Sequence, residues 1–238
     1  MTSTTDPDPT PAPHALWPLT DVRVISGDLE LRYLDDALLF ELAELAAAGV
    51  HSPDAMPFTF PWTRGTPQEV ARSVLAYQWG VRSRLSPQDW TLELAVVRDG
   101  RVLGVQSVMA KDFTVAGALE TGSWLGLRHQ GAGVGTRMRL MILHLAFEGL
   151  GAQVATTSAF EDNPGSNGVT RKIGYLPNGR DAVAREGSPA VSQRYVLDRT
   201  AWDRRAESLR PEVTLHGVES VRTFLGLAPQ VTTTTAAS

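Results

Sequence analysis

The sequence predicts one mixed α/β domain, of the α+β kind, in which helices cover both faces of a central sheet. The chain has 238 residues, enough for one well-buried core, and its hydrophobic fraction of 42% is that of an ordinary globular protein. Strand-like segments in a meander come first, and a strand–helix–strand–helix–strand run around a glycine-rich turn follows. That order is typical of a sheet flanked by helices.

The first half of the chain predicts a strand pair, two helices and a hairpin. In chain order the expected elements are strands 22–26 and 29–33, helices 36–48 and 67–84, and strands 91–97 and 101–111. Asp99-Gly100 is typical of a two-residue hairpin turn, and Thr66 followed by Pro67 is typical of a helix start. Residues 50–63, between the helices, are interrupted by prolines but carry large apolar side chains, so we expect this loop to cover another part of the molecule.

The second half predicts strands and helices in alternation. In chain order the expected elements are strand 118–127, helix 136–147, strand 153–160, helix 163–174, strand 192–197, a helix capped by Thr200 and a last helix over 218–225. Met138, Leu145 and Ala146 recur at helical spacing on one face of the first of these helices, and Gly149 and Gly151 end it.

Composition excludes several functional classes. The net charge is −4 and the sequence pI is about 5.7, so nucleic acid is not an expected partner. The chain has no cysteine, which excludes disulfides and a thiol nucleophile. Its five histidines show no metal-ligand spacing, so we expect no metal site.

The chain ends predict disordered tails around one domain. Residues 1–18 and 228–238 are rich in Thr, Pro or Ala, and we expect residues 19–227 to form the domain between them. The N-terminal segment lacks the basic and apolar regions of a secretory signal, and no apolar run approaches the length of a membrane span. We therefore expect a cytoplasmic protein without membrane association.

Residues 128–136 are the most informative segment. Gly131, Gly133 and Gly135 remove side chains from a turn that exposes several backbone N–H groups. The helix that follows adds its unpaired N–H groups and the positive end of its dipole, so the segment can hold a diphosphate without a metal. A Rossmann motif (G-x-G-x-x-G after the first strand) and a P-loop (Gly-Lys-Ser/Thr) do not fit the spacing. On spacing alone, a glycine turn without a ligand remains the alternative.

Four motifs in a fixed order extend this interpretation to a family. They are Q-G-A-G-V-G at 130–135, T-G-S-W-L at 121–125, A-F-E-G-L-G at 146–151, and D-N-P-G-S-N at 162–167 followed by R-K-I-G-Y at 171–175. Over about residues 90–200 the chain resembles the GNAT N-acetyltransferase superfamily, and in particular its RimJ/RimL branch. The resemblance implies the GNAT fold, a mixed and mostly antiparallel sheet of about seven strands with helices on both faces. It also implies acetyl-CoA or another acyl-CoA as co-substrate.

The resemblance places the coenzyme on the glycine turn, on the end of the strand before it and on a later helix. The implied contacts are Leu125, Gly126, Leu127, Arg128, Gln130, Gly131, Ala132, Gly133, Val134, Gly135, Thr136, Asn163 and Ser166. For Arg128, a solvated surface position is the alternative.

Two of the residues are catalytic candidates. Glu120 occupies a strand position where the family often carries a carboxylate, and it is the candidate base for the acceptor amine; the alternative is a surface residue, with water relaying the proton. Ser166 matches the family serine near the coenzyme sulfur, where it would supply a proton or hydrogen bond to the departing thiolate. Because Pro164-Gly165 departs from the family pattern, Ser166 is alternatively a helix cap.

The acceptor is less well defined. Its candidate lining is Met56, Phe58, Phe60, Trp62 and Trp124, and the alternative is that these side chains fill the core. An apolar pocket suits the amine of a peptide N-terminus or of a small molecule, and the transferred acyl group is acetyl or another short group such as succinyl. Without cysteine, the amine is expected to attack directly in a ternary complex.

Two other functional classes remain open. One is a non-catalytic module that binds or senses acyl-CoA, and the other, weaker one is a nicotinamide-cofactor enzyme. The family also implies a possible homodimer.

Overall fold

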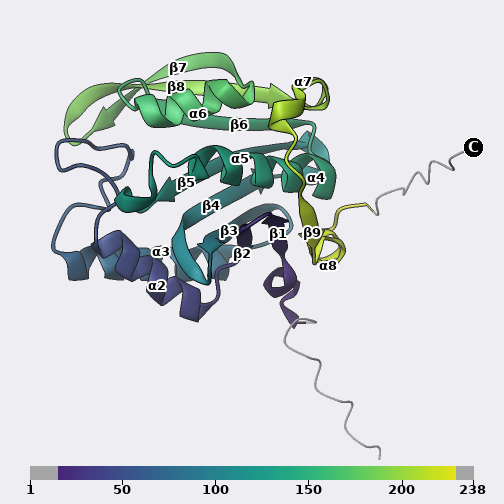
Figure 1. Ribbon diagram of the computed structural model, residues 1–238, viewed down its shortest axis with the longest axis horizontal. Coiled ribbons are helices and arrows are strands. Elements are labelled where there is room, and N and C mark those ends of the chain that lie inside the picture. Colours follow the sequence, from purple (N-terminus) through teal and green to yellow (C-terminus); the bar gives the residue numbers. More distant parts are fainter. Residues whose placement is uncertain (1–15, 229–238) are drawn as a thin grey trace, which may run out of the picture.

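The computed structural model describes residues 16–228 as a nine-stranded sheet with helices on both faces (Figure 1). The strand order is β7-β8-β6-β5-β4-β3-β2-β1-β9, and all neighbours are antiparallel except β5 and β6. The strands are β1 (Arg23–Ser26), β2 (Leu29–Tyr33), β3 (Asp89–Arg98), β4 (Arg101–Lys111), β5 (Ala118–Leu125), β6 (Val154–Phe160), β7 (Leu176–Arg185), β8 (Ser188–Asp198) and β9 (Thr214–His216). The predicted mixed and mostly antiparallel class is confirmed.

The prediction of about seven strands missed β7 and β9. β7 is exposed along most of its length and contains Pro177 and Gly179, which are typical of turns, so its sequence lacks the alternation of a half-buried strand. Its partner β8 extends over 188–198 rather than 192–197. β9 has only three residues and pairs with β1 at the sheet edge.

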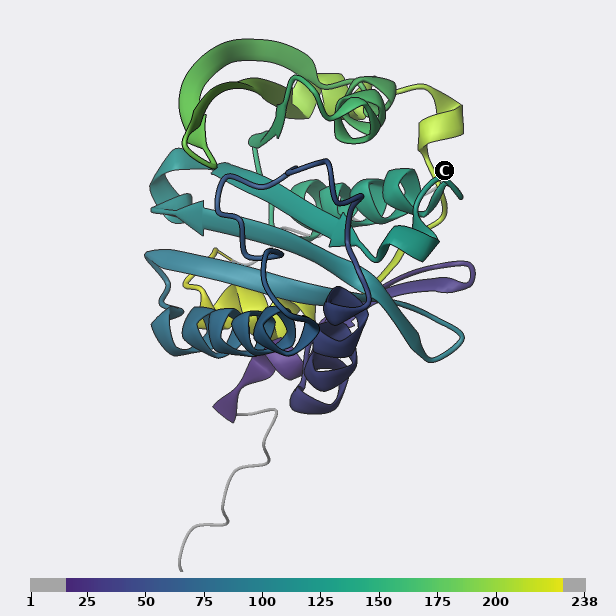
Figure 2. The ribbon, with the colours of Figure 1, turned by 90° about the vertical axis from the view of Figure 1, so that its left-hand side faces the viewer.

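The helices divide between the two faces of the sheet, and each face has its own apolar core. On one face α2 (Asp36–Ala47) and α3 (Pro67–Arg84) pack against β3 and β4, with Val74, Val97 and Val105 among the buried residues. On the other lie α5 (Val134–His144), α6 (Pro164–Ile173) and α8 (Val218–Phe224). Figure 2 shows α2 and α3 in front of the sheet and α5 behind it. Between residues 16 and 228, no helix is long and apolar enough to span a membrane.

The remaining elements are short. They are the helices α4 (Phe113–Ala116) and α7 (Arg199–Asp203), the 3₁₀ turns η1 (Pro18–Asp21), η2 (Leu127–His129) and η4 (Glu207–Leu209), and the π turn η3 (Leu145–Gly149).

Helix starts follow side-chain caps, and one predicted cap was wrong. Thr66 and Glu69 form the capping box of α3. The predicted cap at Thr200 is replaced by Asp198, whose Oδ1 accepts from the Ala201 N–H at 2.7 Å. A carboxylate next to the helix N-terminus is favoured by the helix dipole, which explains the earlier start.

The predicted tails fall mostly outside the described residues. Within the segment expected to be tail, Trp17 Nε1 donates to Tyr33 Oη at 3.0 Å, and its ring packs edge-on against Phe224. Pro18 is buried as the first residue of η1. The packed structure therefore begins slightly before residue 19.

The sheet forks between β5 and β6, the only parallel pair within residues 16–228. The two strands pair over three residues, from Ala118–Val154 to Glu120–Thr156, and beyond that point no pairing joins them. β6 instead stays paired with β8 over its whole length. Just beyond the Glu120–Thr156 pair, the two strands are joined by a side-chain hydrogen bond, in which Thr157 Oγ1 donates to the Thr121 carbonyl at 2.9 Å. The fork therefore opens at Thr121 and Thr157.

Candidate active site

The glycine turn lies between the end of β5 and the start of α5, on one side of the fork. Gly131 and Gly133 have φ of 76° and 80°, a left-handed conformation that favours glycine. Gly133 is the N-cap of α5, and no side chain caps this helix. A Cβ built at either glycine would meet no atom within 4 Å. The first N–H groups of α5 therefore face open space, which is the arrangement that accepts an anion.

Gln130, the first residue of the expected signature, turns its side chain inward. Its Nε2 donates to the Val50 carbonyl at 2.7 Å and to the Leu125 carbonyl at 2.9 Å. This side chain ties the glycine turn to the end of β5 and to the start of the loop over 50–66. Arg128 is exposed, and its Nε donates to the ring of His129 at 3.0 Å.

The main chain between Leu125 and Leu127 is already hydrogen-bonded. The Gly126 N–H donates to Leu103 O at 2.9 Å, and the Leu127 N–H donates to Gly49 O at 3.0 Å. The Gly126 and Leu127 carbonyls accept from His129 and Gln130 in the same turn. The part of β5 that pairs with β4 but not with β6 lies further back, from Gly122 to Trp124.

The start of α6 forms the other side of the fork. Asn163 caps α6, because its Oδ1 accepts from the Ser166 N–H at 3.0 Å. Ser166 is thus inside the first turn and is not the cap, which removes the alternative raised by Pro164-Gly165. Among the residues that the structure describes, the Ser166 hydroxyl has no hydrogen-bond partner. A Cβ at Gly135, near the start of α5, would lie 3.8 Å from Val169, in the middle of α6, so α5 packs beside α6 on this face of the sheet.

Glu120 is at the base of the fork, on the face that carries α2 and α3. It borders a cavity of about 320 Å³ whose other wall residues are Asp89, Thr91, Met109, Ala110, Lys111, Ala118, Leu119 and Thr156. Burial raises the pKa of the Glu120 carboxyl above its usual value, and no cation within the described chain offsets that effect. The Glu120 residue is nevertheless exposed to solvent, and a carboxylate with a raised pKa beside an open cavity can act as a general base.

The aromatic residues of the loop over 50–66 separate into two groups. The rings of Phe58 and Trp62 lie 5.0 Å apart, and Trp62 and Trp124 lie 5.5 Å apart, so three of the five expected side chains form a continuous wall near the end of β5. Met56 is buried, and its carbonyl accepts from Arg185 Nη1 at 3.1 Å. Phe60 is 75% exposed and stands outside this wall.

The loop is also fixed to the β7–β8 hairpin. Arg64 of the loop pairs with Glu186, in the hairpin turn, at 2.7 Å, and Arg185 of β7 donates to the Met56 carbonyl of the loop. Arg185 also pairs with Asp162, which follows β6, at 2.6 Å. The aromatic wall is therefore held between the fork and the hairpin.

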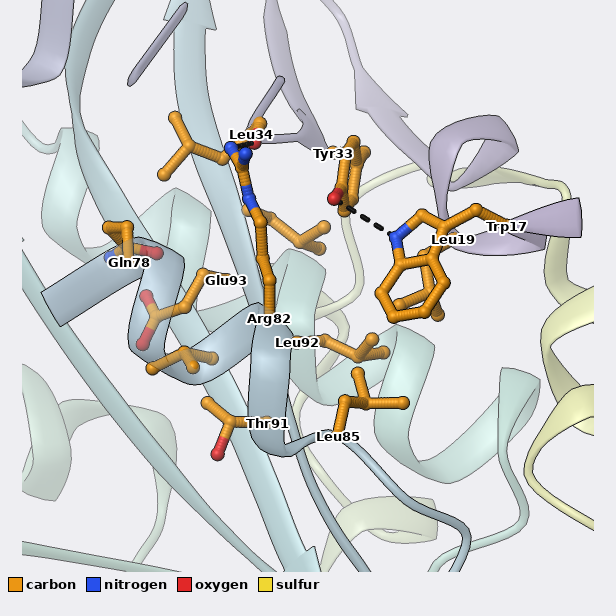
Figure 3. Close-up of a pocket in the computed structure, with 12 residues that line it drawn as sticks. Trp17, Leu19, Tyr33, Leu34, Gln78, Arg82, Leu85, Thr91, Leu92 and Glu93 are labelled. Carbon is orange, nitrogen blue, oxygen red and sulfur yellow. Dashed lines mark hydrogen bonds between the residues drawn. The ribbon is translucent and has the colours of Figure 1, made fainter. Parts of the chain in front are cut away.

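Sequence reasoning missed a buried carboxylate on the same face. Glu93 on β3 accepts from Ser107 Oγ at 2.7 Å and from Tyr77 Oη at 3.3 Å, and burial raises its pKa. Figure 3 shows Glu93 and Gln78 among the residues that line a small hollow under α3. At about 10 Å³, the hollow is close to the smallest space that holds a water molecule, so it is not a substrate pocket.

A second residue that sequence reasoning missed is Arg139, on α5 directly behind the fork. It is 5% exposed; its Nη1 donates to Thr157 Oγ1 at 3.3 Å and its Nη2 to Ser123 Oγ at 3.1 Å. Its guanidinium thus bridges β5 and β6 where they separate. No group of three or more metal-ligating side chains occurs within residues 16–228.

Comparison with known proteins identifies the family. Residues 28–176 match the family model described as "Acetyltransferase (GNAT) domain". Similar solved structures include Mycobacterium smegmatis RimJ in complex with CoA-disulfide (17% identity, 81% of this chain and 92% of that chain, TM-score 0.64). They also include RimL, a ribosomal L7/L12 alpha-N-protein acetyltransferase in complex with coenzyme A (21%, 74% and 97%, 0.57). The microcin C7 self-immunity acetyltransferase MccE with acetyl-CoA and AMP is a third (16%, 72% and 93%, 0.55).

At these identities the structures establish a shared fold, and the family model spans well over half of the chain. The fork, the uncapped α5 and the match over residues 28–176 agree. The chain belongs to the GNAT acetyltransferase family.

Proposed function

We propose that this protein transfers an acetyl or other short acyl group from coenzyme A to the primary amine of a peptide N-terminus or a small molecule. The observation that carries the proposal is the fork, because it is bordered by an uncapped helix N-terminus, by the start of α6 with Ser166, and by Glu120, a carboxylate with a raised pKa. The amine attacks the thioester directly in a ternary complex, since the chain has no cysteine to carry an acyl group.

The donor side of the proposal rests on the main chain of the glycine turn. The N–H groups at the start of α5 bind the diphosphate of the coenzyme, and Gly131 and Gly133 leave room for it. Pantetheine then enters the fork between the start of α6 and the part of β5 that has no pairing with β6. Ser166 faces the sulfur and supplies a hydrogen bond to the departing thiolate. The RimJ and RimL structures, which contain coenzyme A as a disulfide, and the MccE structure, which contains acetyl-CoA, support this class of donor.

The acceptor side rests on the cavity beside Glu120 and on the aromatic wall of Phe58, Trp62 and Trp124. An α-amine has a pKa of about 8 and is neutral in roughly one molecule in ten at neutral pH, whereas a lysine amine is neutral on the order of one in a thousand. A single carboxylate of moderate basicity is therefore sufficient for an α-amine. RimL, which is described as an alpha-N-protein acetyltransferase, supports an α-amine as the acceptor.

The direct test incubates the protein with acetyl-CoA and a panel of amines while free thiol is followed. We expect thiol release that depends on the amine, is greatest with α-amines, and falls in the S166A and E120Q variants. Tight coenzyme A binding without thiol release on any amine, and without an effect of either variant, would instead favour a non-catalytic module that binds acyl-CoA. Stabilisation by NAD and not by coenzyme A would favour a nicotinamide enzyme.

Glu120→Gln is expected to lower kcat by about 10²-fold, at the lower end of the usual contribution of a general base, because an α-amine needs only modest help. In the wild type, Glu120 must be ionised to accept a proton, so kcat falls as the pH falls through its raised pKa. In E120Q this acid limb disappears. The measurement is kcat against pH at saturating acetyl-CoA and acceptor. An unchanged acid limb in E120Q would assign the proton transfer to water or to another group.

A further inference from the structure

Arg139 is a buried cation without an anion. Its side chain is 5% exposed, and within residues 16–228 no carboxylate lies at ion-pair distance from it. Its partners are the hydroxyls of Thr157, Ser123 and Tyr175. A guanidinium that is removed from water without a counter-ion is destabilising, so an arginine at such a position indicates a charge that arrives with a ligand.

The hydrogen bonds of this guanidinium are incomplete. A guanidinium has five N–H donors, and three hydroxyl acceptors surround this one. The Nε–H is buried and has no partner. A carboxylate can accept two parallel hydrogen bonds from the N–H groups of a guanidinium. Serine and threonine hydroxyls beside it can rotate and donate to the same carboxylate oxygens.

Arg139 lies where the acyl group of a bound coenzyme A thioester is expected. Its two bonded hydroxyls belong to β5 and β6, one on each side of the fork, and the Thr157 hydroxyl is also the bridge that closes the base of the fork. Ser123 is only partly buried, so the guanidinium lies just below the surface of the opening. In the proposed function the thioester occupies this opening. A carboxylate within a few bonds of the thioester carbonyl would meet the guanidinium.

We propose that Arg139 binds the free carboxylate of a short dicarboxylic acyl group, so that the preferred donor is a coenzyme A thioester of the malonyl or succinyl class. The inference rests on the proposed function and narrows it to one class of donor. In the transfer, the amine nitrogen forms a bond to the thioester carbonyl carbon, the carbon–sulfur bond breaks, the sulfur leaves as thiolate and takes up a proton, and the distal carboxylate stays ionised throughout. The product is an amide that carries one additional negative charge.

The test compares thioesters of matched shape by titration calorimetry on the full-length protein. Malonyl-CoA and isovaleryl-CoA have the same branched outline, but only the first carries a carboxylate, and succinyl-CoA and acetyl-CoA complete the set. We expect malonyl-CoA or succinyl-CoA to bind at least about tenfold more tightly than isovaleryl-CoA. In R139M this ratio of affinities should fall to about one. R139K keeps the positive charge but loses the planar guanidinium, so it should retain part of the preference for the carboxylate.

Arg222→Met is the matched control. Arg222 is also a buried arginine, 6% exposed, but it has a counter-ion, since its Nε lies 3.7 Å from Glu219 Oε2, and it donates to the Gly149 carbonyl at 3.0 Å. The ratio should not change in R222M.

Equal affinities of the wild type for malonyl-CoA and isovaleryl-CoA would overturn the inference while leaving the proposed function in place, and this comparison needs no variant. A preference that survives in R139M would overturn it as well. If acetyl-CoA and all other thioesters fail to bind, the proposed function and the inference both fail.

Discussion

Replacing Gly133 with alanine is expected to weaken acetyl-CoA binding by about 10- to 100-fold, because losing one hydrogen bond to a charged group costs about 1.5–3 kcal/mol. The new Cβ would meet no protein atom within 4 Å and would project into open space at the start of α5, where the diphosphate is expected to bind. The measurement is the dissociation constant of acetyl-CoA from titration calorimetry.

The control must carry the same backbone strain at a distance from the site. Gly226 has φ of 69°, has no atom within 4 Å of a built Cβ, and follows α8 near the opposite edge of the sheet. Both substitutions place a Cβ in the left-handed region, which costs about 1–2 kcal/mol of stability. G226A should therefore lose about as much stability as G133A but bind acetyl-CoA with the affinity of the wild type. An equal loss of affinity in both variants would mean that backbone strain, and not the loss of hydrogen bonds to the diphosphate, weakens acetyl-CoA binding.

Gly104→Ala is expected to lower the stability of the protein by about 3 kcal/mol, the upper end for overpacking, and Tm by about 6–12 °C. A Cβ at this position of β4 would lie 2.2 Å from the Trp124 carbonyl oxygen and 2.8 Å from Leu125 Cα. Both are main-chain atoms of β5, so no side-chain rotation relieves the contact. β4 and β5 would have to separate at the end of β5, where the aromatic wall and the glycine turn begin. Thermal unfolding and the thiol-release assay measure the two consequences.

Gly122→Ala serves as the control for stability within the same strand pair. Its Cβ would approach only the flexible end of Met109, at 3.8 Å, which is ordinary contact. We expect its Tm to remain within about 3 °C of the wild type, as for a substitution that changes stability by less than 1 kcal/mol. A G104A variant that unfolds at the wild-type temperature would show that β4 and β5 are not in close contact at this point.

The parts of the fold that local chemistry specifies were predictable. Thr66 and Glu69 identify the start of α3, Asp99-Gly100 identifies the hairpin between β3 and β4, and the alternate glycines identify the turn before α5. β7 was not predictable in this way, because its residues are mostly exposed and contain Pro177. A strand that extends from the sheet as part of a hairpin has no buried face and hence no apolar alternation.

The sequence indicated most of the candidate site residues, but two buried polar groups near them, Glu93 and Arg139, were missed for a physical reason. In β3 the alternation of Thr91, Leu92, Glu93 and Leu94 indicates a solvent-facing carboxylate, but helices cover both faces of this sheet and Glu93 lies under α3. Arg139 likewise lies in a helix whose apolar spacing is satisfied by its neighbours. Only the tertiary arrangement brings its guanidinium to the fork between β5 and β6.

The measurement that tests the account most directly is amide hydrogen exchange across the chain, with and without saturating acetyl-CoA. The N–H groups of residues 131–136 have an open approach in the free protein, and the diphosphate should bond to them directly. The account predicts strong protection of this segment on binding, followed by protection at the start of α6. Unchanged exchange over residues 131–136, with protection elsewhere in the chain, would contradict it.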